Sequence, residues 1–416
     1  MKVFKFGGAS VSTIERIQNV SKILKNYSGQ HLLVVVSAMG KTTNALEKVA
    51  ESFFTGNTQE ALSFFDKIKK EHTDLSVNLH IESSGLADFF TEIEWLLHDK
   101  PVRSYDYYYD QIVSAGELLS TSIVGTYFES VGIANQWIDV RDIIRTDNNF
   151  RDAAINLDVT QSHIIEKIKP LFERTSIIIT QGFIGATDEN ESTTLGREGS
   201  DYTAAVFANL LDAESQTIWK DVQGVLNADP KQYNKAEWIR ELNYKEVIEM
   251  AYYGAQVIHP KTIKPLQNKN IPLHVKSFLE PGDEGTIVHN KNLQGLPPII
   301  VYKTNQVLMQ LSSKDFSFVN EGLTAELYNM FDKLKFKPNL TQNAAISLLC
   351  VVDGHEEKVG LLAHTAADLF DVQITKGLTL LTIRHFNEAI VKELCNDKTV
   401  ILQQQTPETI QLLTTA

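Results

Sequence analysis

Two stretches of this chain combine charged side chains with glycines in a way that suits the binding of phosphate or carboxylate groups. The first, "VFKFGGAS", places Lys5 two residues before the paired Gly7 and Gly8. The second, "TTLGREGSDYTAA", holds Arg197 in a glycine-containing loop and Asp201 where a helix would begin. Glycine lets a backbone approach a ligand closely, lysine supplies a point charge, and the arginine fork matches a carboxylate or phosphate. These residue types predict a site that brings anions together.

The first stretch stands where a strand passes into a helix. Behind the glycines, "SVSTIERIQNVSKILKN" has Ser12 and Glu15 at the spacing of a capping box and apolar residues at helical intervals. The unpaired N–H groups at a helix start favour a bound phosphate. An ordinary turn with a surface lysine would show the same pattern, so this stretch alone does not establish a site.

Other candidate residues also follow predicted strands. Ser37 and Thr43 come at and after the end of the apolar run "HLLVVVSA". Glu117 stands at a helix start in "SAGELLS", and Asp221 lies in the turn-rich stretch "WKDVQGVLNADPK" that follows a strand. Each has a common structural role in caps, first turns or loops. Ligands of parallel α/β sheets bind beyond the carboxyl ends of the strands, so the ordered set favours one shared site. The tyrosine-rich "SYDYYYD" (104–110) is interpreted as packing or interface surface.

The composition indicates a soluble globular protein with more than one domain. The 416 residues exceed one ordinary core, and 43% are hydrophobic against 22% charged. A formal charge of −13 argues against nucleic acid or an anionic membrane as a partner. Two cysteines give no disulfide framework, and no signal peptide or membrane span is evident. We therefore predict a cytoplasmic protein, with no metal site of its own.

The order of predicted elements indicates two parts. Up to about residue 295 the strand candidates "ANQWIDV", "SIIITQGFIGA", "TIWKDV" and "IPLHVKS" alternate with helices or loops, and 44–110 is mostly helical, which is typical of a doubly wound α/β domain. The segment "HNKNLQGLPP" is the expected linker. Beyond it, shorter units starting with the strand "QVLMQLSS" predict two small antiparallel α/β modules in tandem.

The motifs together resemble a known family. "KFGGAS", "GREGSDYTAA", "WKDVQGVLNADPK" and "GAQVIHPKTI" look like the aspartate kinases of the amino acid kinase superfamily, and the C-terminal modules resemble the paired ACT regulatory domains of that family. The resemblance implies a three-layer αβα catalytic domain over 1–295 and two ferredoxin-like βαββαβ modules over 296–416. It also implies transfer of the γ-phosphoryl group of ATP, with Mg²⁺, to the β-carboxylate of L-aspartate, the first step towards lysine, threonine and methionine. No fused homoserine dehydrogenase domain is expected.

The resemblance further implies a role for each matching position. Lys5 would stabilise the moving phosphoryl group and Asp201 would organise the basic groups around it. Arg197 would pair with the α-carboxylate of aspartate, and Glu117 would face its amino group. The other substrate-binding positions are Ser37, Thr43, Phe183 and Ser200. The positions that would bind the nucleotide, besides Lys5, are Gly7, Gly8, Lys220, Asp221, Leu226, Lys231, Gln256 and Val257.

Several positions depart from residues that are frequent in the family. Glu198 follows Arg197 where many relatives have glycine. The other departures, which put the nucleotide contacts in question, are Lys220 for threonine, Leu226 for tyrosine, Lys231 for arginine and Gln256 for lysine. None of them removes Lys5, Arg197 or Asp201.

The paired ACT modules imply regulation and association. Such pairs bind amino acids at their mutual interface, so a lysine or threonine effector and a homodimer through these modules are expected. Asp315 and Asn339 occupy the corresponding loop positions, where ordinary turn residues would serve equally.

Three other functions remain open from the sequence. The chain could be another kinase of the superfamily, acting on glutamate, acetylglutamate or UMP. It could be an amino-acid sensor with an impaired kinase domain, as the Gln256 and Leu226 departures would suggest. A dinucleotide-binding dehydrogenase is disfavoured, because the first turn is Gly-Gly-Ala rather than G-x-G-x-x-G.

Overall fold

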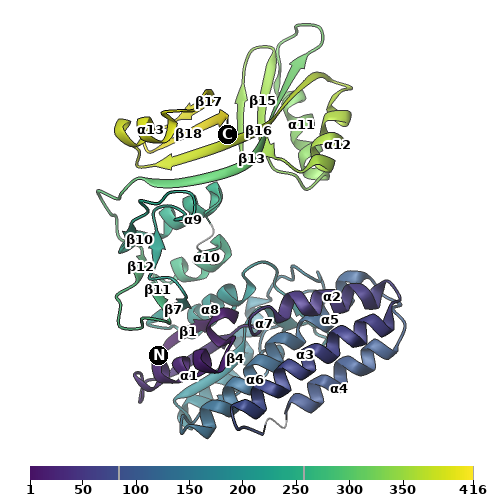
Figure 1. Cartoon of the computed structure of the whole chain (residues 1–416), viewed down its shortest axis with the longest axis vertical. Coiled ribbons are helices and arrows are strands. Elements are labelled where there is room, and N and C mark those ends of the chain that lie inside the picture. Colours follow the sequence, from purple (N-terminus) through teal and green to yellow (C-terminus); the bar gives the residue numbers. More distant parts are fainter. Residues whose placement is uncertain (83–84, 256–257, 416) are drawn as a thin grey trace. The chain divides into compact units, whose positions relative to one another are not determined.

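The computed structural model describes residues 1–82, 85–255 and 258–415 and contains two compact units (Figure 1). The first unit comprises Met1–Val225, Trp238–Ile248 and Val257–Leu293. The second comprises Leu226–Glu237, Glu249–Gln256 and Gln294–Ala416, so it includes two segments that precede residue 295. None of the helices in the described ranges is long and apolar enough to cross a membrane.

The first unit is built on an eight-stranded sheet with the order β10-β12-β11-β7-β1-β2-β4-β3. Its strands are β1 Lys2–Phe6, β2 Leu32–Val36, β3 Gln136–Trp137, β4 Ile177–Gln181, β7 Ser215–Lys220, β10 Glu241–Asn243, β11 Leu273–Ser277 and β12 Thr286–His289. Every pair of neighbours is parallel except β11 with β12. The strand β2, Leu-Leu-Val-Val-Val, is buried throughout because both faces of a parallel sheet are covered.

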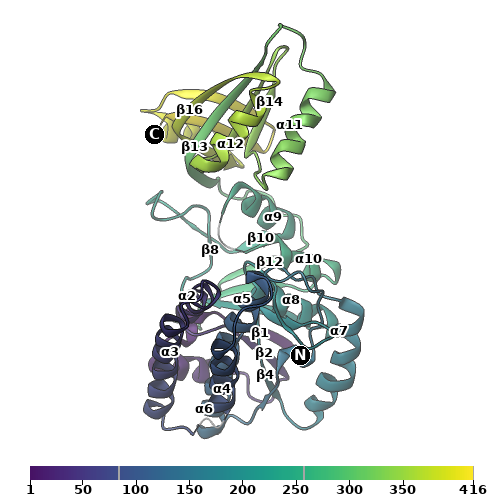
Figure 2. The ribbon, with the colours of Figure 1, turned by 90° about the vertical axis from the view of Figure 1, so that its right-hand side faces the viewer.

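Helices cover both faces of this sheet, which confirms the predicted three-layer α/β class. The helices of the first unit are α1 Ile14–Lys25, α2 Thr42–Phe54, α3 Thr58–Asn78, α4 Gly85–His98, α5 Tyr105–Val113, α6 Ala115–Ser130, α7 Leu157–His163, α8 Gly199–Leu210 and α10 Pro260–Asn268. The helix α9 (Tyr244–Tyr253) has residues in both units. Two hairpins add β5 Ile184–Ala186 with β6 Ser192–Thr194, and β8 Val225–Leu226 with β9 Trp238–Ile239. Figure 2 shows strands β1, β2 and β4 between α3, α4 and α6 on one side and α7 on the other.

The alternation of side chains along β1 decides which layer each residue meets. Phe4 and Phe6 lie in the core formed with helices α1 to α6, where Phe6 stacks on Trp219 with ring centroids 5.8 Å apart. Successive side chains of a strand point to opposite faces, so Lys5 points to the face on which α8 packs. Asp201 lies in the first turn of α8. The alternation of side chains along β1 therefore points Lys5 towards the start of α8, where Asp201 lies.

The helix behind the glycine pair begins later than predicted. A 3₁₀ turn over Gly8–Val11 comes first, and Thr13 is the N-cap of α1, accepting a hydrogen bond from the Arg16 N–H at 3.3 Å. Ser12, the predicted cap, instead donates to the carbonyl of Ala9 at 3.0 Å. The capping-box prediction is wrong by one residue because the 3₁₀ turn takes up the residues that follow the glycines.

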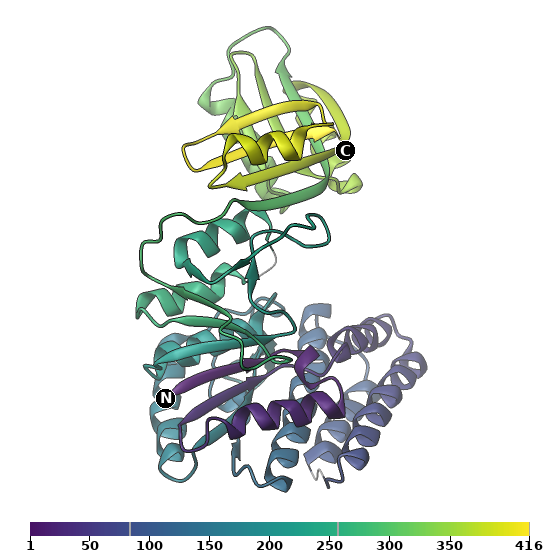
Figure 3. The ribbon, with the colours of Figure 1, turned by 60° about the vertical axis from the view of Figure 1, so that its left-hand side comes forward.

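The second unit contains a six-stranded antiparallel sheet with the order β14-β15-β13-β16-β18-β17. Its strands, seen side by side in Figure 3, are β13 Ile299–Ser313, β14 Leu340–Asn343, β15 Ser347–Asp353, β16 Phe370–Arg384, β17 Val400–Gln405 and β18 Thr409–Thr415. Its further helices are α11 Glu321–Lys333, α12 Glu356–Ala366 and α13 Glu388–Cys395. The order β13-α11-β14-β15-α12-β16 is the βαββαβ pattern predicted for an ACT-like module.

The two modules share strands, which the sequence did not indicate. The predicted first strand of the modules, "QVLMQLSS", is only the second half of β13, which begins at Ile299. The register between β13 and β16 shifts between Lys303 and Gln306, and Asn305 has a left-handed φ of 52°. Polar residues at this irregularity interrupt the apolar pattern, so the sequence shows two short strands where the backbone forms one.

Candidate active site

A pocket of about 580 Å³ opens in the first unit where the central strands end. Lys5 comes from β1, Ser37 follows β2, and Lys220 ends β7. The residues predicted from the sequence that line this pocket are Lys5, Ser37, Thr43, Glu117, Phe183, Arg197, Ser200, Asp201 and Lys220. The fold thus brings together side chains from distant parts of the chain.

A buried ion pair lies in this pocket. The Nζ of Lys5 is 2.6 Å from Oδ1 of Asp201, and the two side chains are 12% and 4% exposed. Removing one partner of such a pair leaves an uncompensated buried charge, which typically costs about 3–5 kcal/mol. Because one partner is on a central strand and the other on a helix, the ammonium group has a fixed position.

The glycine turn is needed for close packing. A Cβ on Gly8 would lie 2.4 Å from the carbonyl oxygen of Ala38, and the Gly40 N–H donates to the Gly8 carbonyl at 3.0 Å. A Cβ on Gly7, whose φ is −76°, would lie 3.5 Å from the Lys5 Nζ. The turn therefore packs directly against the loop after β2, and Gly7 and Gly8 are not among the residues that line the pocket.

Glu117 is buried with one oxygen unsatisfied. It is 2% exposed, its Oε1 accepts from the Ala38 N–H at 3.3 Å, and its Oε2 has no hydrogen-bond partner within the described part of the chain. Burial raises the pKa of Glu117 to about 8, although the Ala38 N–H and the charge of Lys5 oppose the shift. With this pKa, Glu117 is mostly protonated at neutral pH, and a cationic group placed beside Oε2 would favour release of the proton.

Arg197 stands in a strained turn at the start of α8. Its side chain is exposed and makes no hydrogen bond or ion pair with the residues that the structure describes. The next residue, Glu198, caps α8 in the left-handed region with φ 55°, which costs a non-glycine residue roughly 1 kcal/mol or more. A glycine at this position would adopt that conformation without the cost. The turn leaves the Arg197 guanidinium available to a ligand.

The segment carrying Phe183 is tied to α8. Phe183 has a left-handed φ of 70°, and its N–H donates to Oγ1 of Thr203 at 3.1 Å. The Leu195 N–H donates to the Phe183 carbonyl at 2.8 Å. A Cβ on Gly182 would lie 2.6 Å from the Cβ of Ser200, so these backbones are in close contact. Phe183 and Ser200 therefore lie on one wall.

The sequence reasoning missed part of the pocket wall. Glu47, Tyr109 and Arg151 line the pocket, together with Thr194, Gly196, Glu198 and Gly199. Tyr109 belongs to the tyrosine-rich stretch that was interpreted as packing or interface surface. It is 8% exposed, and its hydroxyl donates a hydrogen bond to Glu47 at 2.7 Å. Glu47 stands four residues after Thr43 on α2, a spacing that puts both on one helix face and could have suggested it. Arg151 has no comparable local signal.

The predicted nucleotide positions are only partly gathered at this pocket. Asp221 is exposed and is not among the residues that line it. Leu226 and Lys231 belong to the second unit. Gln256 and Val257 lie outside the described residues.

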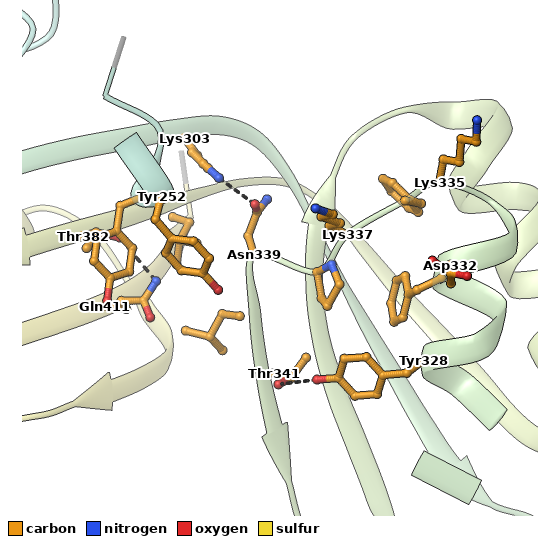
Figure 4. A pocket seen from close by; sticks show the side chains of 16 residues that line it. Tyr252, Lys303, Tyr328, Asp332, Lys335, Lys337, Asn339, Thr341, Thr382 and Gln411 are labelled. Carbon is orange, nitrogen blue, oxygen red and sulfur yellow. Dashed lines mark hydrogen bonds between the residues drawn. The ribbon is translucent and has the colours of Figure 1, made fainter. Parts of the chain in front are cut away.

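The second unit has a pocket of its own, of about 680 Å³ (Figure 4). Asn339 lines it, accepts from the Lys303 Nζ at 2.6 Å, and donates to Gln306 at 2.7 Å and Asp353 at 2.8 Å. Asp315 is not among the residues that line this pocket. Its exposed carboxylate accepts from Ser317 and Ser313, and these hydrogen bonds lower its pKa to about 2. The structure thus places one of the two predicted effector residues in a cavity.

Comparison with known proteins agrees with this architecture. The model of the amino acid kinase family matches residues 1–277. Aspartokinase 3, chloroplastic, of Arabidopsis thaliana is 32% identical over 367 residues, which cover 84% of this chain and 64% of the relative. The lysine-sensitive aspartokinase 3 of Escherichia coli K12 is 29% identical over 391 residues, covering 92% of this chain and 86% of the relative. The chain thus spans less than two thirds of the plant relative.

Solved structures match over the whole chain. E. coli aspartokinase III in complex with aspartate and ADP has a TM-score of 0.81 at 26% identity, covering 100% of this chain and 96% of that one. The same enzyme with lysine and aspartate has a TM-score of 0.79 at 26% identity, covering 99% and 95%. Aspartate kinase of Clostridium acetobutylicum, 20% identical with a TM-score of 0.81 and coverage of 100% and 96%, supports the fold. The family model and these similarities confirm the resemblance predicted from the motifs, and the chain belongs to the amino acid kinase family.

Proposed function

We propose that this chain is an aspartate kinase, which transfers the γ-phosphoryl group of ATP to the β-carboxylate of L-aspartate. The observation that carries the proposal is the buried Lys5–Asp201 pair at 2.6 Å, in a pocket that also holds Arg197 and Glu117. The similarity to E. coli aspartokinase III, whose structure contains aspartate and ADP, supports both substrates.

The chemistry needs positioned charge rather than a general base. A carboxylate with a pKa near ~4 is already ionised at neutral pH, so no proton has to be removed from the attacking oxygen. The remaining task is to bring two anions together and to stabilise charge on the transferring phosphoryl group. A lysine held on a central strand meets that need, because its ammonium group is fixed before the substrates arrive.

The aspartate side of the pocket carries complementary groups. Arg197, which has no partner in the described part of the chain, would bind the α-carboxylate through its guanidinium. Glu117 would face the amino group through its unsatisfied Oε2. The other proposed aspartate contacts are Ser37, Thr43, Phe183 and Ser200.

The nucleotide side combines the glycine turn with basic groups. Lys5 would contact the transferring phosphoryl group, and Gly7 and Gly8, in the turn that follows the strand of Lys5, would hold the nucleotide phosphates. The remaining proposed nucleotide positions are Lys220, Asp221, Leu226, Lys231, Gln256 and Val257. The described residues contain no group of three or more His, Cys, Asp or Glu side chains suited to a metal ion. We expect Mg²⁺ to arrive with the nucleotide, mostly bound to phosphate and water. The Mg²⁺ ion would neutralise phosphate charge. The carboxylate paired with Lys5 is that of Asp201.

We further propose that the second unit makes the enzyme responsive to an amino acid, lysine or threonine, and that the protein is a cytoplasmic homodimer associated through its ACT-like modules. Asn339 and its pocket, and more weakly Asp315, are the proposed effector contacts. The lysine bound to E. coli aspartokinase III favours lysine as the first effector to test.

Trapping the product tests the function directly. The chain is incubated with MgATP and aspartate, glutamate or acetylglutamate, with and without lysine or threonine, and any acyl phosphate is converted to its hydroxamate. With UMP, whose product UDP forms no hydroxamate, formation of UDP is the signal. Signal with aspartate alone supports the proposal. A folded protein that gives no signal would instead be an amino-acid sensor, and signal with another acceptor would indicate a different kinase of the family.

Lys5→Ala should lower kcat for aspartate phosphorylation by about 10²-fold or more, because it removes the fixed charge at the phosphoryl group. Lys2→Ala, on the same strand and outside the pocket lining, is the matched control and should leave kcat near the wild-type value. Circular dichroism and thermal unfolding check that the Lys5 variant is folded. Near-normal turnover by folded Lys5→Ala protein would contradict the assignment.

Arg197→Ala should raise the KM for aspartate far more than the KM for ATP. Loss of a charge-assisted pair worth about 1.5–3 kcal/mol corresponds to roughly a ten- to hundredfold rise in KM. Steady-state kinetics with each substrate varied in turn measure the two values. Equal effects on both substrates would remove the assignment of Arg197 to aspartate.

The KM for aspartate should fall as the pH rises from 7 to 8.5. With a pKa of about 8, the fraction of Glu117 that is ionised, and so can bind the substrate ammonium group, rises about eightfold over this interval. Glu117→Gln should flatten this dependence, whereas the KM for ATP serves as the control in both proteins. A wild-type KM for aspartate that does not change over this pH range would disprove the role.

A further inference from the structure

We propose that Arg151 is a second substrate-binding arginine, and that Arg151 and Arg197 form a two-arginine clamp on the two carboxylates of aspartate, spaced by the buried carboxylate of Asp110. The inference rests on the proposed function and extends it, because neither Arg151 nor Asp110 belongs to the residues that the family motifs suggest.

Arg151 lies on the aspartate side of the pocket. Its guanidinium carbon is 4.5 Å from the centre of the Tyr109 ring, and both residues line the pocket. The Tyr109 hydroxyl donates to Glu47, one helical turn after Thr43 on α2. Stacking on an aromatic face fixes the plane of a guanidinium group and leaves its N–H donors available at the edge. The arginine is therefore presented beside the proposed aspartate contacts.

The backbone at Arg151 is strained and held in place. Its φ is 71°, a left-handed conformation that costs a residue with a side chain roughly 1–2 kcal/mol. Its N–H donates to Oδ2 of Asp110 at 3.0 Å, which offsets part of that cost. Strain of this kind persists where the surroundings determine the geometry, and it concentrates at functional sites.

The same carboxylate holds the strand that leads to Arg197. Asp110 is fully buried and also accepts from the N–H of Thr194 at 2.8 Å and from its hydroxyl at 2.7 Å. Thr194 ends β6, three residues before Arg197, and its carbonyl accepts from the Ala153 N–H at 3.0 Å. Burial raises the pKa of Asp110 to about 6, so the group remains ionised at neutral pH. One carboxylate thus sets the spacing between the backbones that carry both arginines, which makes Asp110 a positioning residue.

A surface ion pair is the competing explanation for Arg151. Its NH1 is 3.1 Å from Oδ1 of Asp106, with the two side chains 48% and 55% exposed. Exposed pairs of this kind contribute only about 0–1 kcal/mol, so the guanidinium can exchange Asp106 for a ligand at little cost. Carboxylates of the protein also line the pocket and would repel the two carboxylates of an incoming aspartate. They are Glu47, Glu117, Glu198 and Asp201. Lys5 is paired with Asp201 and Lys220 is a proposed nucleotide contact, so without Arg151 the two carboxylates of the substrate would meet little positive charge besides Arg197.

The test compares Arg151→Ala and Arg151→Lys with Asp106→Asn, which removes only the surface partner. Arg151→Ala should raise the KM for aspartate about tenfold or more, with kcat and the KM for ATP changed less than twofold, which corresponds to the loss of about 1.4 kcal/mol or more. Arg151→Lys should recover part of the loss, because it keeps the charge without the fork. Asp106→Asn should not raise the KM for aspartate.

A second variant tests the role of Asp110. Asp110→Asn keeps the size of the side chain but replaces one acceptor by a donor facing N–H groups, so the KM for aspartate should rise by at least as much as in Arg151→Ala, with a smaller change in the KM for ATP. Thermal unfolding identifies any general loss of structure. Such a loss would lower kcat without raising the KM for aspartate more than the KM for ATP.

The outcomes separate the two levels of the proposal. If the wild type yields aspartyl hydroxamate and Arg151→Ala behaves like Asp106→Asn, the clamp is wrong and the kinase function stands. If Arg151→Ala affects the KM for ATP as strongly as that for aspartate, the assignment to aspartate is likewise wrong. If the folded wild type yields no aspartyl hydroxamate, the proposed function fails and the clamp fails with it.

Discussion

A lysine held still inside the protein is the constraint on which the site depends. Lys5 is on a central parallel strand whose Val3, Phe4 and Phe6 are core residues, and a charged group there is costly unless it is paired. Asp201 supplies the pair from the first turn of α8, where a negative charge is also favoured by the helix dipole. Lys5 and Asp201 both line the pocket, so a ligand there can meet the charge. The ion pair therefore links the stability of the central layer to the chemistry of the pocket.

The net charge of the chain makes positive charge inside the pocket more important for binding anions. With a formal charge of −13, the protein as a whole repels the anions that its site must hold. The pocket overcomes this locally in two ways. It gathers cationic side chains, of which Lys5 is held in place by Asp201, and its burial of Glu117 raises the pKa of that carboxyl, which reduces the negative charge there. Affinity in such a site comes from placement of a few groups, not from the field of the whole molecule.

In the second unit, shared strands replace the two separate modules that the sequence suggests. Since β13 and β16 each run through both halves of one sheet, neither half can shift without changing the strands of the other. The register of β13 shifts directly after Lys303, and the Nζ of Lys303 donates a hydrogen bond to Asn339 in the pocket of Figure 4. The pocket is therefore adjacent to this irregularity of the sheet. A ligand bound there would contact an element common to both halves.

The sequence by itself determined what depends on neighbours in the chain. Apolar runs and helical spacing gave the α/β class of the first unit, and the residues beside glycines after strands identified Lys5, Arg197 and Asp201, because turns and strand ends have local signatures. The N-cap of α1 was predicted one residue too early because a turn precedes Thr13. The first half of β13 was missed because a register irregularity interrupts its apolar pattern. Only the tertiary structure decided that Lys5 meets Asp201 and that Asp110 joins the backbones of Arg151 and Thr194. Those contacts join residues that are far apart in the chain, and burial and hydrogen bonding across such separations leave no periodic trace in the sequence.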